Sequence, residues 1–167
     1  MQTHQTFSVT RTLNAPRQLV FDAFAKPEAL AKWWGPVEAP IDVLSLDFRP
    51  GGHFHYRMNG AQVTYGIKHY REIDEPNGIT WVNSFADKEG NAIKPPFEGI
   101  DLPRDMLITI TLTEKYGVTT LVLTSEPINA TESEINTFYG FRESMEQGFG
   151  GMFGQLEKFL AEVKSKN

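Results

Sequence analysis

The stretch that decides the fold is "TESEINTFYGFRESMEQGFGGMFGQLEKFLAEV", residues 131–163. Thr131 and Glu134 have the spacing of a capping box, in which two side chains satisfy the first backbone N–H groups of a helix. Behind them, apolar residues recur at steps of three and four: Ile135, Phe138, Met145, Phe149, Met152, Leu156, Phe159, Leu160 and Val163. This spacing predicts one amphipathic C-terminal helix of roughly 30 residues.

Glycines interrupt this expected helix at positions 140, 148, 150, 151 and 154. Each glycine costs a helix about 1 kcal/mol relative to alanine. Close packing against another element, or a kink, would explain them structurally, and we favour this interpretation. Room left beneath the helix for a ligand would explain them functionally.

The residues before this helix form short runs with alternating apolar and polar side chains, separated by turns. Such runs are typical of antiparallel strands. They cover residues 6–13, 41–48, 53–58, 63–73, 79–87, 105–114 and 118–126. No other long helix is expected, so the C-terminal helix must pack on the sheet. The prediction is an α+β fold with a curved antiparallel sheet of about six to seven strands.

Two short helices are expected between the first and second strands. Pro27 ends the first of them and opens the second, which runs over residues 28–34 and stops at Gly35-Pro36. Trp33 and Trp34 are adjacent, and neighbouring side chains of a helix point about 100° apart. Either one ring is partly exposed, or the helix ends between them.

The length and net charge of the chain argue against several classes of function. The 167 residues suit a single domain over residues 1–167. The net charge of −5 argues against binding to nucleic acid or to an anionic membrane surface. The chain has no cysteine, no apolar run long enough to span a membrane and no signal-peptide pattern near its start. A cytoplasmic protein is therefore expected.

Metal binding and acid–base catalysis have weak candidates. His53 and His55 share one face of an expected strand, and His69 is a conceivable third ligand, but a solvent-facing polar row explains them more simply. Glu143 and Glu146 are the only carboxylates worth considering for catalysis, and no partner group is evident for either. We therefore assign no metal, no cofactor and no catalytic residue.

Four segments together resemble one protein family. They are "LNAPRQLVFDAFAKPEALAKWWGP" (13–36), "LDFRPGGHFHYRM" (46–58), "GIKHYREIDEPNGITW" (66–81) and "EQGFGGMFGQLEKFL" (146–160). They are similar to bacterial homologues of the activator of the heat-shock protein 90 ATPase (AHSA-like), within the START-like, SRPBCC or birch-pollen-allergen-like superfamily. Phe149 stands where that family usually has tryptophan.

The resemblance implies a helix-grip fold, in which the sheet wraps around the long helix and leaves a cavity between them. The short helices would close the mouth of that cavity, with one of the two tryptophans in the core and the other at the lip. The segment 88–104 is longer than the connection usual in the family. Long loops are often functional, so this one is a candidate lid or dimer interface.

The leading hypothesis is non-enzymatic binding of a small apolar or aromatic ligand in this cavity. Ligand sites are mostly apolar with a few polar groups, and Tyr56, Tyr65 or Trp81 could orient a ligand by a hydrogen bond. The candidate wall residues are aromatic or methionine: Trp33, Trp34, Phe54, Tyr56, Tyr65, Trp81, Phe85, Met106, Phe138, Phe141, Met145, Phe149 and Met152.

Two alternatives stay open. The family name suggests a co-chaperone in the stress response, which would need an exposed patch that fits a chaperone. Some START-like relatives are enzymes of the polyketide cyclase type, which would need an acid or base inside the cavity. Either function is compatible with a homodimer.

Overall fold

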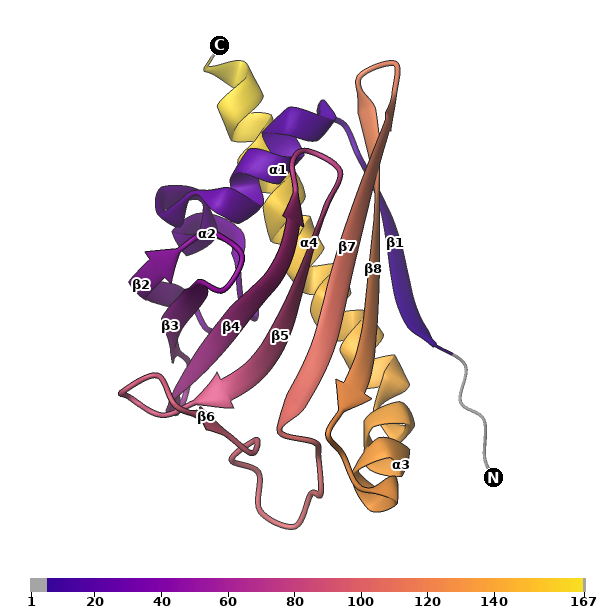
Figure 1. The fold of residues 1–167 in the computed structure, drawn as a ribbon. Coiled ribbons are helices and arrows are strands. Elements are labelled where there is room, and N and C mark those ends of the chain that lie inside the picture. Colours follow the sequence, from indigo (N-terminus) through magenta and orange to yellow (C-terminus); the bar gives the residue numbers. More distant parts are fainter. Residues whose placement is uncertain (1–5, 167) are drawn as a thin grey trace.

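An antiparallel sheet curls around one long helix in the computed structural model, which describes residues 6–166 (Figure 1). The strands of this part of the chain are β1 (Phe7–Leu13), β2 (Ile41–Asp47), β3 (His53–Asn59), β4 (Val63–Asp74), β5 (Gly78–Ala86), β6 (Ala92–Ile93), β7 (Asp105–Lys115) and β8 (Val118–Ile128). Seven of them pair in the order β1-β8-β7-β5-β4-β3-β2, and the two-residue β6 pairs with β5. The predicted α+β fold is confirmed.

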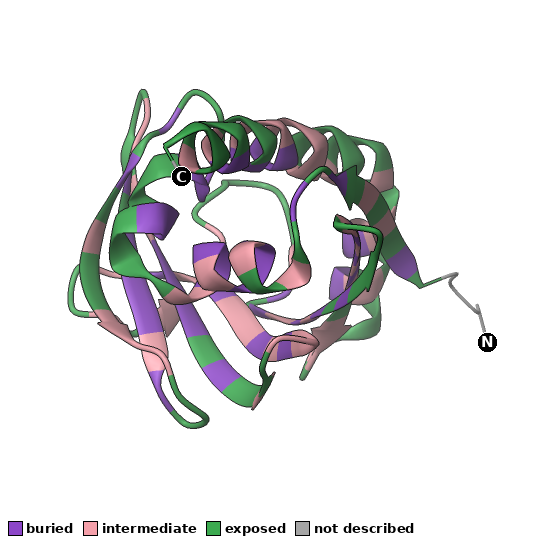
Figure 2. Ribbon diagram, turned by 90° about the horizontal axis from the view of Figure 1, so that it is seen from above, coloured by how far each residue is buried: buried purple, intermediate pink, exposed green. Residues whose placement is uncertain are grey.

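Two short helices follow β1, α1 (Arg17–Ala25) and α2 (Pro27–Trp33), as the proline at position 27 predicts. Near the C-terminus lie α3 (Glu132–Gly140) and α4 (Arg142–Ser165). Viewed from above, α4 crosses the open side of the curved sheet (Figure 2). This is the helix-grip arrangement. No helix within residues 6–166 is long and apolar enough to cross a membrane.

The prediction of one continuous C-terminal helix is wrong. The capping box is present, with Thr131 Oγ1 accepting from the Glu134 N–H at 3.1 Å and Glu134 Oε1 accepting from the Thr131 N–H at 2.8 Å. Helical geometry then stops at Phe141, which has φ −94° and ψ 15°. Its N–H donates to the carbonyl of Phe138, a tighter turn than an α-helix makes. Gly140, a poor helix former, directly precedes this break.

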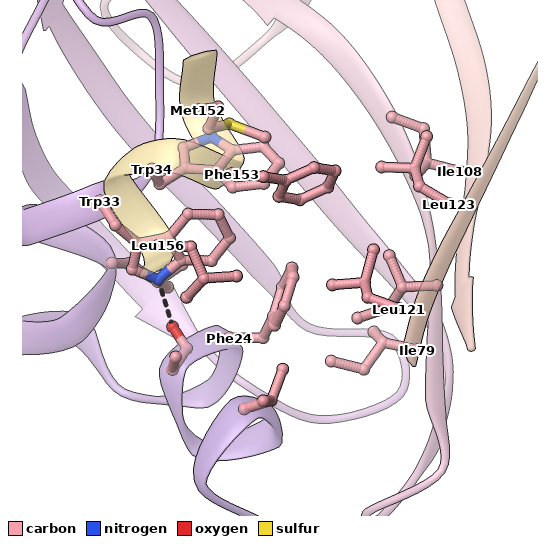
Figure 3. Close-up of a cluster of buried hydrophobic side chains, with 14 of the residues drawn as sticks. Phe24, Trp33, Trp34, Ile79, Ile108, Leu121, Leu123, Met152, Phe153 and Leu156 are labelled. Carbon is pink, nitrogen blue, oxygen red and sulfur yellow. Dashed lines mark hydrogen bonds between the residues drawn. The ribbon is translucent and has the colours of Figure 1, made fainter. Parts of the chain in front are cut away.

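One end of the interior is packed with buried side chains. Phe24 of α1, Trp33 of α2 and Phe153 and Leu156 of α4 are fully buried and meet side chains of the sheet (Figure 3). The Trp33 indole N–H donates to the carbonyl of Ala23 at 2.8 Å, so its polar atom is satisfied inside the core. The two short helices therefore form a packed plug.

Trp33 and Trp34 both point inward because the helix ends between them. Trp34 has the extended angles φ −73° and ψ 142°. Its side chain is 6% exposed, and that of Trp33 is 0% exposed. Of the two alternatives, the end of the helix between the two tryptophans is confirmed, and the change of backbone conformation removes the 100° separation of neighbouring helical residues.

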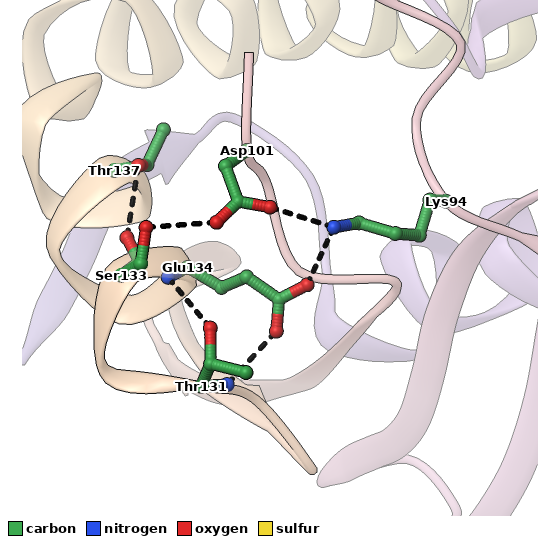
Figure 4. A network of polar contacts seen from close by, with 6 residues as sticks. All are labelled: Lys94, Asp101, Thr131, Ser133, Glu134 and Thr137. Atoms are coloured by element: carbon green, nitrogen blue, oxygen red, sulfur yellow. Dashed lines mark hydrogen bonds and ion pairs between the residues drawn. The ribbon is translucent and has the colours of Figure 1, made fainter. Parts of the chain in front are cut away.

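The segment between β5 and β7 is tied down at both ends. Its strand β6 pairs with Phe85 and Ala86 of β5. Lys94 Nζ lies 2.7 Å from an oxygen of Asp101 and 2.8 Å from an oxygen of Glu134 (Figure 4). Ser133 also donates to Asp101, at 2.8 Å. These contacts hold the segment against the start of α3.

Candidate functional site

A partly open cavity of about 380 Å³ lies between the sheet and the first half of α4. Its walls are mostly apolar, with a few polar groups from Asn83, Ser84, Ser125 and the Tyr56 hydroxyl. The complete lining consists of Trp34, Gly35, Pro36, Tyr56, Met58, Gly66, Asn83, Ser84, Phe85, Met106, Ile108, Ser125, Met145, Gly148, Phe149 and Met152. This composition is the usual one of small-molecule sites.

Glycines border this cavity on two sides. Gly148 of α4 lines the cavity and is exposed, and a Cβ built on it would meet no atom within 4 Å, so this position faces open space. On β4, a Cβ at Gly66 would collide with the ring of Tyr56, so the tyrosine ring lies directly on the glycine backbone. The functional interpretation of the helix glycines thus fits Gly148, whereas Gly151 packs against Val37.

Tyr56 connects the cavity floor with the end of α2. Its hydroxyl is hydrogen-bonded to the side chain of Trp34, whose indole N–H is the donor. Burial raises the pKa of the Tyr56 hydroxyl to about 12, and the hydrogen bond from Trp34 opposes part of that rise. Tyr56 therefore stays neutral at physiological pH.

A second apolar hollow of about 420 Å³ lies under the 88–104 segment. It shares Phe85, Met106 and Met145 with the first cavity, so these three side chains form the wall between the two. Its other lining residues are Pro95, Phe97, Ile100, Leu102, Pro103, Phe138, Phe141 and Ser144.

Twelve of the thirteen predicted wall residues separate into three groups. Seven line the first cavity: Trp34, Tyr56, Phe85, Met106, Met145, Phe149 and Met152. Phe138 and Phe141 line only the second hollow. Trp33, Phe54 and Trp81 are fully buried and line neither cavity, because neighbouring rings cover them.

Tyr65, the remaining predicted wall residue, lies on the other face of the sheet. It precedes Gly66, which lines the cavity, and successive strand residues point to opposite faces. Its ring instead lies 5.9 Å from that of His55. Tyr65 therefore cannot orient a ligand in the cavity.

Lys68 is a functional candidate that the sequence analysis missed. Its side chain is 1% exposed, and its Nζ lies 3.3 Å from the centre of the Trp34 ring and 4.1 Å from that of Trp81. Burial lowers the pKa of its ammonium well below the usual value. The alternation of β4 was an available signal, since Lys68 shares the inner face with Gly66 and Tyr70.

His53, His55 and His69, the histidines that the structure describes, do not gather into a metal-binding group. Within residues 6–166, no group of three or more histidine, cysteine, aspartate or glutamate side chains is placed to hold a metal ion. His53 instead lies 2.6 Å from the Ser45 hydroxyl. The expectation of a solvent-facing row is wrong for His55, which is buried and contacts the Asp87 carbonyl at 3.1 Å, because residues 87–90 fold over it.

The candidate catalytic carboxylates lie outside both cavities. Glu143 and Glu146 are exposed on α4 and line neither cavity. No acid–base pair of the described residues faces the apolar space, so the geometry offers no support for a cyclase-type reaction.

A family model and several solved structures resemble this chain. A family model described as "Activator of Hsp90 ATPase homolog 1-like protein" matches residues 14–161. A solved protein from Staphylococcus epidermidis is 27% identical, with a TM-score of 0.75, and the match covers 98% of this chain and 93% of the other. Protein Ms6760 of Mycobacterium smegmatis is 25% identical, with a TM-score of 0.75 and coverage of 93% and 90%.

A third similar structure is protein CV1439 of Chromobacterium violaceum. It is 26% identical, with a TM-score of 0.69, and the match covers 93% of this chain and 96% of the other. A comparison with curated proteins finds no match.

Proposed function

The chain belongs to the activator of Hsp90 ATPase homolog 1-like family, and on that premise we propose that it binds a small, largely apolar or aromatic molecule between the sheet and α4. The observation that carries the proposal is the cavity of about 380 Å³ with its mostly apolar wall. Binding is non-enzymatic in this proposal, because the cavity wall includes no carboxylate or histidine.

The residues of the wall indicate the shape of the ligand. Met106, Met145 and Met152 are unbranched and adapt to irregular molecules. Phe149 and Phe85 offer ring faces and edges to an aromatic group. Asn83 and Ser125 can donate to or accept from one or two polar atoms, which would fix the orientation of the ligand.

A thermal-shift screen with apolar and aromatic small molecules tests this proposal. A ligand at 100 times its dissociation constant adds roughly 2.7 kcal/mol of stability. We expect a saturable shift for the wild type and its loss in Met145→Trp, because the indole would fill the cavity. Glu146→Trp is the matched control, since it adds the same side chain at the exposed neighbouring position.

The thermal shifts of the two variants show whether the ligand binds in the cavity. If Met145→Trp and Glu146→Trp both keep the shift, the ligand binds elsewhere and the proposal is wrong. If no compound of a broad panel shifts the wild type, the cavity is not a binding site.

A second candidate function is a protein–protein contact of the co-chaperone type. Phe97, Ile100 and Phe141 expose 47%, 38% and 37% of their surfaces around the second hollow. Exposed apolar groups that gather in this way often mark interaction surfaces. The test is the ATPase rate of heat-shock protein 90 with the wild type and with Phe97→Ser. An unchanged rate on addition of the wild type would exclude this function.

A further inference from the structure

Lys68 is enclosed by aromatic rings in the interior of the protein. Besides Trp34 and Trp81, the rings of Phe54 and Phe24 lie 5.4 Å and 5.8 Å from its Nζ. These rings come from α1, β3, β5 and the end of α2, so four separate elements converge on one amine. Burying a lysine among aromatic rings costs folding free energy, so its presence here needs an explanation.

Lys68 does not line the proposed ligand cavity but shares several neighbours with it. Lys68 is two residues from Gly66 on β4, so both point to the inner face, and Gly66 lines the cavity. Asn83, which pairs with Lys68 across the β4–β5 ladder, lines it as well. Trp34 contacts both the cavity and the amine. It forms part of the cavity wall, and the centre of its ring lies 3.3 Å from Nζ of Lys68.

Burial favours the neutral form of this amine. Desolvation disfavours the ammonium form, so the pKa of Lys68 is lowered and the neutral amine is favoured. The surrounding rings attract a cation and offset part of this effect. The titratable neighbours on β3 and β4 are Tyr56 and Tyr70, and burial raises the pKa of both hydroxyls, so neither supplies a negative charge near neutral pH.

A neutral lysine in an apolar site is a nucleophile for carbonyl carbon. We propose that Lys68 forms an imine with an apolar or aromatic aldehyde or ketone that enters the cavity past Trp34. The inference rests on the proposed ligand-binding function and specifies the chemical class of the ligand.

The reaction balances without a further reactant. The amine nitrogen attacks the carbonyl carbon, and one amine proton moves to the carbonyl oxygen to give a carbinolamine. The second amine proton leaves with that oxygen as water, and the C=N bond forms. Nothing is oxidised or reduced.

Reductive trapping tests the proposal. The purified protein is incubated at pH 7 with benzaldehyde and cyanoborohydride, and adducts are counted by intact mass and located by peptide mapping. An exposed lysine is about 0.04% unprotonated at this pH. We therefore expect Lys68 to be modified at least about tenfold faster than the exposed Lys88 and Lys158.

Two variants test separately which residue reacts and how the aldehyde reaches it. Lys68→Met should lose the fast adduct while its exposed lysines react as in the wild type. Trp34→Ala should modify Lys68 faster still, because the ring that covers the amine is gone. If Lys68 reacts no faster than the exposed lysines in both the wild type and Trp34→Ala, the proposal is wrong.

Benzyl alcohol distinguishes this inference from the binding function on which it rests. It resembles benzaldehyde in shape but has no carbonyl group. A thermal shift with benzyl alcohol but no Lys68 adduct with benzaldehyde would overturn the imine and leave the binding function standing. Absence of both the shift and the adduct would overturn both.

Discussion

The two halves of α4 face the same sheet but differ in what lies between. In the second half, Phe153, Leu156 and Leu160 are buried against the plug that α1 and α2 form. In the first half, Gly148 faces open space, and Met145 and Phe149 border the cavity. The interior is therefore solid where α1 and α2 pack against α4. It is hollow where the facing side chains are small or flexible.

The largest effect should come from truncating one phenylalanine in each half. Phe153→Ala should lower the free energy of unfolding by about 3–5 kcal/mol, because the ring is fully buried and leaves a void. Phe149→Ala, one turn earlier, should cost less than about half of that, since its ring already borders a cavity. Urea denaturation of both variants measures the difference. Equal losses would mean that the two halves are packed alike.

Lys68→Met should stabilise the protein at pH 7, by about 1 kcal/mol or more, because it replaces a buried amine with an apolar side chain of similar length. The folded-state pKa of Lys68 is lowered, so the unfolded chain binds more protons between that pKa and about 10.4. The wild type therefore gains stability as the pH rises through this window, and the advantage of the variant shrinks.

Denaturant titrations from pH 6 to pH 10 measure this trend. Lys158→Met, at an exposed position of α4, is the control and should show no such convergence with the wild type. A stability difference between Lys68→Met and the wild type that does not change with pH would mean that Lys68 keeps its charge in the folded protein.

The smallest expected effect is the difference in stability between alanine substitutions at two glycines of α4. Gly148→Ala should stabilise the protein by up to about 1 kcal/mol, because alanine favours the helix and its methyl group enters open space. Gly151→Ala should gain less, since its Cβ would lie 3.0 Å from Cγ2 of Val37. Thermal unfolding compares the two. A larger gain at position 151 would contradict the assigned open and packed sides of the helix.

Most elements of the fold could be predicted because their signals are local. The alternation in residues 105–126 specifies two strands, and the step of three and four after Thr131 specifies a helix that packs on them. The break at Phe141 was missed, because the apolar spacing continues across it and the glycine at position 140 is only one of five.

The candidate site was predicted in part. Aromatic and methionine side chains on the inner face, such as Tyr56 and Met145, were found from composition and periodicity. Tyr65 was assigned to the cavity although its neighbour Gly66 occupies that face. Lys68 was overlooked, because a lysine in a strand is ordinarily exposed and it is buried here by rings from other strands and from the short helices.

The sequence by itself determined the α+β architecture, an antiparallel sheet with a long C-terminal helix packed on it, since strand and helix periodicities depend on residues close together in the chain. The tertiary structure alone decided that Trp34 turns inward, that Gly148 faces a cavity and that four aromatic rings surround Lys68. These features depend on cross-strand register and on the packing of α1 and α2, which bring together residues far apart in the chain. Burial and the pKa shifts that follow from it are properties of that assembly.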